Sequence, residues 1–158
     1  RSFLTANNLE FITDFCAGEG LQFITLAASK ANCVTVGQKK VYHYRTDNAT
    51  SATTKPDVER QGIGAITTMQ YICEHLDLSN PKVRKAYNWR LWSTYGYCLR
   101  QIIATHQEHV YRDLLRTCIH HRRSLALPMI AADISMKRKI IALLTFISPT
   151  VVAKLSLR

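Results

Sequence analysis

The sequence predicts a mixed α/β segment over residues 1–55, followed by a mostly α-helical region over residues 56–158. Short runs of β-forming residues follow a helical pattern in the first segment, and apolar residues recur at helical spacing after Val58. The polar stretch Thr46–Asp57 separates the two regions. With 47% apolar and 20% charged residues, the chain of 158 residues is expected to fold and to bury a core.

The first segment combines one predicted helix with two predicted short strands. Leu21–Lys30 has apolar residues at helical spacing. Cys33–Val36 and Lys40–Tyr44 are rich in β-forming residues and are separated by Gly37, which is typical of two strands joined by a turn. These patterns predict the α/β character of the segment.

The second region is expected to contain four helices. Apolar stripes at helical spacing occur over Glu59–Leu76, Lys82–His106, Val110–His121 and Met136–Leu157. Ser79-Asn80-Pro81 is a typical helix start, because a capping side chain precedes a proline in the first turn. These helices are expected either to pack as a compact bundle or to lie splayed against another domain.

The net charge of +10 is concentrated in the helical region. Residues 1–58 hold six Lys/Arg and five Asp/Glu, and residues 59–158 hold fifteen and six, so the two net charges are +1 and +9. This asymmetry indicates an anionic partner, such as acidic lipid, nucleic acid or a phosphorylated substrate. Five cysteines without a CxxC pair predict no disulfide framework, and reduced thiols in a cytosolic compartment are expected.

Residues 136–158 are a candidate membrane-docking helix. The basic collar Lys137-Arg138-Lys139 precedes an apolar stretch that is too short and too interrupted to predict a membrane-spanning helix. Each Lys or Arg beside an anionic leaflet contributes roughly 1 kcal/mol, and an apolar helix face can enter the headgroup boundary. The alternative is that this segment packs on the other helices as ordinary core.

Histidines and arginines elsewhere give weaker signals. His106 and His109 are three residues apart, and His120 and His121 are adjacent, but no carboxylate or thiolate set accompanies them, so no metal ligand is assigned. A basic cluster lies near helical spacing over residues 112–123. Because no nucleic-acid motif accompanies this cluster, no specific nucleic acid is expected as a partner.

Several short motifs follow one another in the first segment. They are Arg1-Ser2-Phe3-Leu4, Asn8-Leu9-Glu10-Phe11, Gly18-Glu19 with Phe23, Val41-Tyr42-His43-Tyr44-Arg45 and the loop Asn48-Ala49-Thr50-Ser51. Their order and spacing resemble the acceptor-side segment of family-2 glycosyltransferases. On this resemblance, residues 1–55 are the C-terminal part of a catalytic domain of GT-A type, and residues 56–158 are its basic helical tail.

The resemblance implies a parent enzyme that transfers a sugar from a nucleotide-sugar donor to a surface-polysaccharide or lipid-linked acceptor. In the family, an Asp-x-Asp motif in the donor-binding half holds a divalent metal, Mg or Mn. This chain contains no Asp-x-Asp. The chain alone is therefore expected to bind no cofactor and to be inactive, and the implied location is cytoplasmic, peripheral on the inner face of the plasma membrane.

The resemblance also assigns site residues. In the family the base is the Asp of Glu-Asp, and here Gly20 occupies that position. Either Glu19 takes the proton from the acceptor hydroxyl, or the protein is an inactive relative, or the alignment slips by one residue. Glu19 is equally interpreted as a first-turn carboxylate stabilised by the helix dipole. His43 and Arg45 are assigned beside the donor diphosphate, with two solvated side chains as the alternative.

A second class of function needs no sugar chemistry. The basic helical region would then be a non-enzymatic module that binds an anionic membrane or a partner protein. The two classes differ in what precedes Arg1, because the enzyme needs a donor-binding half with an Asp-x-Asp motif.

Overall fold

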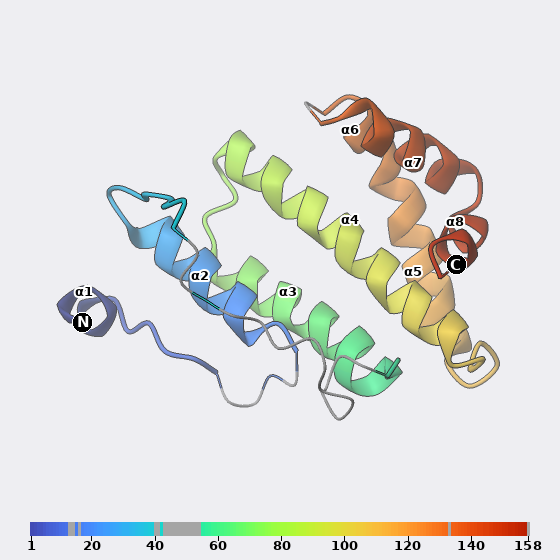
Figure 1. Cartoon of the computed structure of the whole chain (residues 1–158), viewed down its shortest axis with the longest axis horizontal. Helices are drawn as coiled ribbons and strands as arrows, with labels where there is room; N and C mark the ends of the chain where they lie inside the picture. Colours follow the sequence, from blue (N-terminus) through green and yellow to red (C-terminus); the bar gives the residue numbers. More distant parts are fainter. Residues whose placement is uncertain (13–14, 16, 40–41, 43–54, 133, 158) are drawn as a thin grey trace.

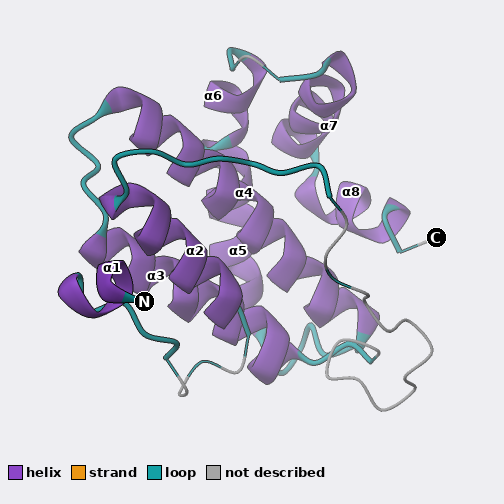
Figure 2. Ribbon diagram, turned by 60° about the vertical axis from the view of Figure 1, so that its left-hand side comes forward, coloured by secondary structure: helices purple, strands orange, loops and turns teal. Residues whose placement is uncertain are grey.

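A computed structural model describes residues 1–12, 15, 17–39, 42, 55–132 and 134–157 (Figure 1). Over these residues the chain consists of helices and loops, without a strand (Figure 2). In chain order the elements are α1 (Ser2–Ala6), α2 (Glu19–Lys30), the π-helical η1 (Val58–Ile63), α3 (Gly64–His75), α4 (Pro81–Ala104), α5 (Arg112–Ser124), α6 (Ala126–Ile130), α7 (Met136–Ile147) and α8 (Pro149–Leu155).

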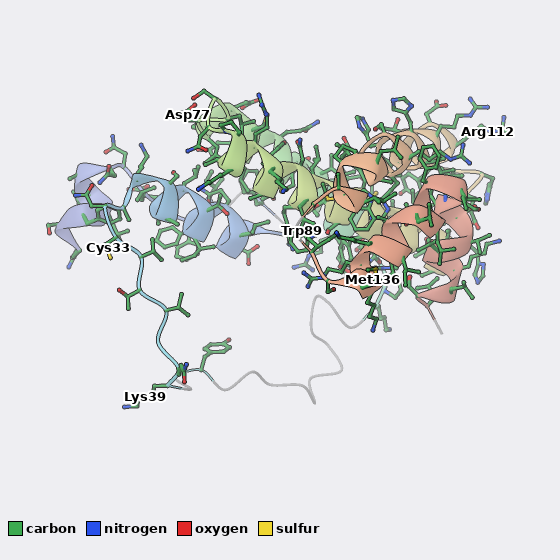
Figure 3. All side chains as sticks on the ribbon, turned by 90° about the horizontal axis from the view of Figure 1, so that it is seen from above. Cys33, Lys39, Asp77, Trp89, Arg112 and Met136 are labelled. Carbon is green, nitrogen blue, oxygen red and sulfur yellow. The ribbon has the colours of Figure 1, made fainter. Side chains whose placement is uncertain are left out.

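The predicted α/β character of the first segment is wrong for the part of it that is described. Cys33–Val36 is an exposed loop, and Figure 3 shows the chain from Cys33 to Lys39 extending away from the helices. Val36 is 87% exposed. A strand needs a neighbouring strand for its backbone groups and a surface that covers one of its faces, and β-forming residues alone provide neither. The second predicted strand lies outside the described residues, apart from Tyr42 in a loop.

The helix signals at α2 and α4 are confirmed. Helix α2 covers the predicted Leu21–Lys30 and begins directly after Gly18, whose φ is +93°. Helix α4 begins at Pro81, and the Asn80 side chain accepts a hydrogen bond from the backbone N–H of Lys82 at 3.0 Å. A proline suits the first turn of a helix because the N–H that it lacks would have no partner there.

Helix α4 is the centre of the fold. It packs against η1, α3, α5 and α8, and Figure 1 shows it between α3 and α5. Cys98, Leu99 and Ile102 are fully buried on one side of α4, where they meet Cys118 of α5. Cys98 and Leu99 are adjacent, and Ile102 follows one helical turn later, so the three side chains lie on the same apolar face of α4.

Helix α2 is joined to the rest of the fold through α3. The two helices pack against each other, and the Thr68 hydroxyl of α3 donates a hydrogen bond to the Ala17 carbonyl at 2.6 Å. The start of η1 is fixed to α4, because the backbone N–H of Asp57 donates to the Gln101 side chain at 3.1 Å. Residues from the predicted first region therefore pack directly on residues from the second.

The predicted helix over Met136–Leu157 is divided into α7 and α8. Helix α7 ends at Ile147, and α8 begins at Pro149. Proline lacks the N–H that an interior helical position needs, and its ring clashes with the preceding turn, so Pro149 starts a new helix. Helix α7 packs against α5 and α6, and Trp92, Met129 and Ala142 form a second, smaller core there.

Candidate functional site

The outer side of α7 and α8 exposes a row of large apolar side chains. We call this surface the α7–α8 face; it consists of Met136, Ile140, Leu143, Leu144, Phe146, Ile147, Val151 and Leu155. Ile140 and Ile147, two turns apart, are 52% and 65% exposed. Because Ala142 and Thr145 on the inner side are buried, α7 has both a packed side and an unpartnered apolar side. Exposed contiguous apolar surface of this kind marks an interaction site.

Cations border the α7–α8 face. Lys137 in the first turn of α7 and Lys154 on α8 are exposed beside it, whereas Arg138 lies on the opposite side of α7, with its guanidinium carbon 5.2 Å from the centre of the Trp89 ring. Residues 134–158 contain no Asp or Glu. The face is therefore apolar at its centre and positively charged at its edge. No helix in the described part of the chain combines the length and the apolar character that a membrane span needs.

Arg122 of α5 is buried behind this face. It is 7% exposed, and its guanidinium carbon lies 3.8 Å from the centre of the Trp92 ring. Its Nη1 donates to the Trp92 carbonyl at 2.9 Å, and its Nη2 donates to the Thr145 hydroxyl at 3.2 Å. Its buried Nε has no hydrogen-bond partner among the described residues, and no carboxylate among them forms an ion pair with it.

Burial lowers the pKa of Arg122 to about 10, and the positive charge of Arg100 contributes to the same shift. Arg122 is still charged at neutral pH. The desolvation of a buried ion costs several kcal/mol, which an opposite charge normally offsets. Here the offset comes only from a ring face, a carbonyl and a hydroxyl within the described structure.

Arg122 and Arg100 line a cavity of about 320 Å³ between α4, α7 and α8. The remaining walls are mainly apolar and include Leu99, Ile141, Leu144, Pro149, Val152, Ala153 and Leu155. Gly96 is required beside the guanidinium, because a Cβ there would lie 2.8 Å from the guanidinium carbon of Arg122. Leu144 and Leu155 belong both to this cavity and to the α7–α8 face, so the cavity lies directly under that face.

The basic cluster predicted over residues 112–123 is divided by the structure. Arg112 and Arg116 are exposed, whereas Arg122 is buried and faces α4 and α7. The burial of Arg122 was missed because all these cations were assigned to one surface. A signal was present: Leu115, Cys118 and Arg122 follow helical spacing, which places Arg122 on the apolar side of α5.

Glu19 and Gly20 open α2. Both are exposed, and a Cβ on Gly20 would meet nothing within 4 Å. Beside them, a cavity of about 360 Å³ starts at Ala17 and Gly18. Its polar lining comprises Arg90, Ser93, Thr94, Tyr97 and Arg100 of α4 and Thr68 of α3. His43 and Arg45, the predicted diphosphate contacts, lie outside the described residues.

The histidines in the described part of the chain do not gather into a metal site. His106 and His109 lie in the turn after α4, and the ring of His121 stacks on Tyr95 at 4.3 Å. Burial lowers the pKa of His121, and the neighbouring His120 contributes to that shift. Within the described ranges, no group of three or more His, Cys, Asp or Glu side chains could hold a metal ion.

No protein-family model, curated protein or solved structure matches this chain. The features that bear on function are therefore the α7–α8 face, the two cavities that share Arg100, and the motifs near Glu19.

Proposed function

We propose that the chain docks peripherally on an anionic membrane surface through the α7–α8 face, and that it is the acceptor-side part of a family-2 glycosyltransferase. The observation that carries the docking proposal is the unpartnered apolar side of α7, with exposed Lys137 in its first turn and exposed Lys154 on α8. The order and spacing of the motifs around Glu19 support the enzymatic part. The enzyme would then act on a lipid-linked or polysaccharide acceptor at the cytoplasmic face of the plasma membrane.

An anionic bilayer fits the α7–α8 face in both shape and charge. A helix that lies in the plane of the headgroups buries its apolar side, and each buried Å² of apolar surface contributes about 25 cal/mol. Each Lys or Arg near an anionic leaflet adds roughly 1 kcal/mol. A protein partner would need only the apolar centre, whereas acidic lipid also uses Lys137 and Lys154, with no Asp or Glu in residues 134–158 to oppose it.

The double variant Ile140→Asp/Ile147→Asp is expected to bind phosphatidylglycerol-containing vesicles at least about thirtyfold more weakly than the wild type. Each exposed isoleucine would bury apolar surface worth roughly 1 kcal/mol in the bilayer, and each new carboxylate is repelled by anionic lipid. Both side chains are exposed, so the fold should be retained. The measurement is vesicle co-sedimentation, with circular dichroism as a check on folding.

The matched control is Ile24→Asp, because Ile24 is 61% exposed on α2, away from the α7–α8 face. It should bind vesicles as the wild type does. Docking is refuted if wild-type protein does not sediment with anionic vesicles, if it binds pure phosphatidylcholine equally well, or if the double variant matches the control.

The sugar-transfer part of the proposal is based on the start of α2. Glu19 is exposed directly after Gly18, which lines the 360 Å³ cavity. Hydroxyl and guanidinium groups from Ser93, Tyr97 and Arg90 are suited to the hydroxyls and phosphates of a glycan acceptor. We assign Glu19 the role of general base toward the acceptor hydroxyl. Because the chain lacks Asp-x-Asp, the metal and the nucleotide-sugar would be held by another part of the parent enzyme.

Glu19→Gln is expected to lower sugar transfer by the full-length parent about a hundredfold, since general-base catalysis contributes about that much. The assay follows transfer from a nucleotide-sugar with a divalent metal present. Glu10→Gln makes the same charge change at another exposed position and should retain activity.

Gly20→Asp separates the remaining interpretations, because the open space around Gly20 admits an aspartate. Activity that appears only in Gly20→Asp would show that Glu19 is not the base. Inactivity of both the wild type and Gly20→Asp would remove sugar transfer from the proposal and favour the alternative, a non-enzymatic helical module.

A further inference from the structure

We infer that the cavity lined by Arg122 and Arg100 binds the phosphate group of an anionic phospholipid. The inference rests on the proposed membrane docking and deepens it, because it adds one specific lipid contact to a surface that otherwise recognises only charge and apolar area.

Arg122 carries a buried positive charge that no described carboxylate balances. Arg122 is buried, its Nε has no partner among the described residues, and half-buried Arg100 also lines the cavity. Buried ions in proteins are normally paired, since an isolated one carries its full desolvation cost. Arg100 and Arg122 bring like charges to one cavity, and an anion in that cavity would offset both. The planar donors of arginine match the geometry of a phosphate group.

The other walls of the Arg122 cavity are mainly apolar. Ile141, Leu144, Val152 and Leu155 line the cavity, and Leu144 and Leu155 also lie on the exposed α7–α8 face. An inorganic phosphate ion would leave these walls without a partner. A phospholipid would place its phosphate at the arginines while its chains continue past Leu144 and Leu155 into the bilayer.

The Arg122 guanidinium is preorganised for a ligand. The Trp92 ring, the Trp92 carbonyl and the Thr145 hydroxyl hold the Arg122 guanidinium in one orientation. The missing side chain at Gly96 provides the space that this orientation needs. A ligand that binds here does not have to order the arginine first, which reduces the entropic cost of binding.

The experiment measures thermal unfolding of the full chain with short-chain phospholipids below their micelle concentration. Dihexanoyl phosphatidylglycerol is expected to raise the Tm by about 5 °C at concentrations far above its Kd, because a ligand that binds only the folded state stabilises it. Dihexanoyl phosphatidylcholine and inorganic phosphate should each raise the Tm much less. None of these three ligands forms a bilayer under these conditions, so the result is independent of vesicle docking.

Two site variants and one matched control complete the test. Arg100→Gln and Arg122→Gln should each abolish the Tm rise that phosphatidylglycerol produces. Arg116→Gln, which removes an exposed arginine of α5 far from the cavity lining, should preserve it. If Arg122→Gln fails to fold, the half-buried Arg100→Gln decides the question.

Four results would overturn the inference: no Tm rise with phosphatidylglycerol, an equal rise with phosphatidylcholine, an equal rise with inorganic phosphate, or an undiminished rise in Arg100→Gln. If the lipid site fails while Ile140→Asp/Ile147→Asp still weakens vesicle binding, docking stands without this contact. If docking fails and the Tm rise persists, the cavity binds its lipid without using the α7–α8 face.

Discussion

Leu99→Ala is expected to lower the free energy of unfolding by about 3–4 kcal/mol. Leu99 is fully buried in the middle of α4 and packs in the main core with Ile102 and Cys118. The walls around it come from several different helices, so they cannot close in together on the space that the lost side chain leaves. Leu99 also lines the Arg122 cavity, and the truncation would enlarge that cavity beside a buried charge.

Chemical denaturation followed by circular dichroism measures this loss as a lower midpoint concentration. The control is Leu127→Ala, because Leu127 is exposed on α6. Its effect should stay within about 0.5 kcal/mol. Similar losses in the two variants would contradict the assignment of the core to the inner side of α4.

Gly18→Ala is expected to lower the free energy of unfolding by about 2–3 kcal/mol, which is the second large effect. Gly18 has a φ of +93°, and an L-residue in the left-handed region is strained by about 1–2 kcal/mol. The added Cβ would also lie 2.9 Å from the Oγ1 and Cγ2 atoms of Thr68. Thr68 is fully buried and its hydroxyl donates to the Ala17 carbonyl, so it has little freedom to move away.

Gly20→Ala is the contrasting change two residues further on. Gly20 lies inside α2, and nothing is within 4 Å of a Cβ there. Replacing a helical glycine by alanine then stabilises the helix by up to about 1 kcal/mol. The two glycine substitutions should therefore shift the Tm in opposite directions. A shift of the same sign in both would refute the strain and contact assigned to Gly18.

Sequence signals that lie within a single helix predicted that helix well. The capping pair Asn80-Pro81 and the apolar periodicity of α2 and α4 are of this kind. Pro149 also gave a usable signal, since a proline cannot lie inside a helix, and the expected single helix over Met136–Leu157 is in fact α7 and α8.

Features that depend on distant parts of the chain could not be predicted in the same way. The β-forming residues of Cys33–Val36 remain in a loop because no partner strand lies beside them in the described structure. The cavity at Arg122 forms only when α4, α5, α7 and α8 are assembled, and the importance of Gly96 depends on that assembly. Only the apolar surroundings of Arg122 within α5 could have indicated its burial.

The central position of α4 has a consequence for cooperativity. Because η1, α3, α5 and α8 all pack on this one helix, no layer of the core is complete without it. The backbone hydrogen bonds around Leu99 and Ile102 therefore open to solvent only when the whole molecule unfolds, so their amide protons belong to the slowest class of hydrogen exchange. The exposed loop over 33–39 opens independently. Since Leu99 of α4 also lines the cavity under the α7–α8 face, a lipid bound there would slow amide exchange in the middle of α4 as well.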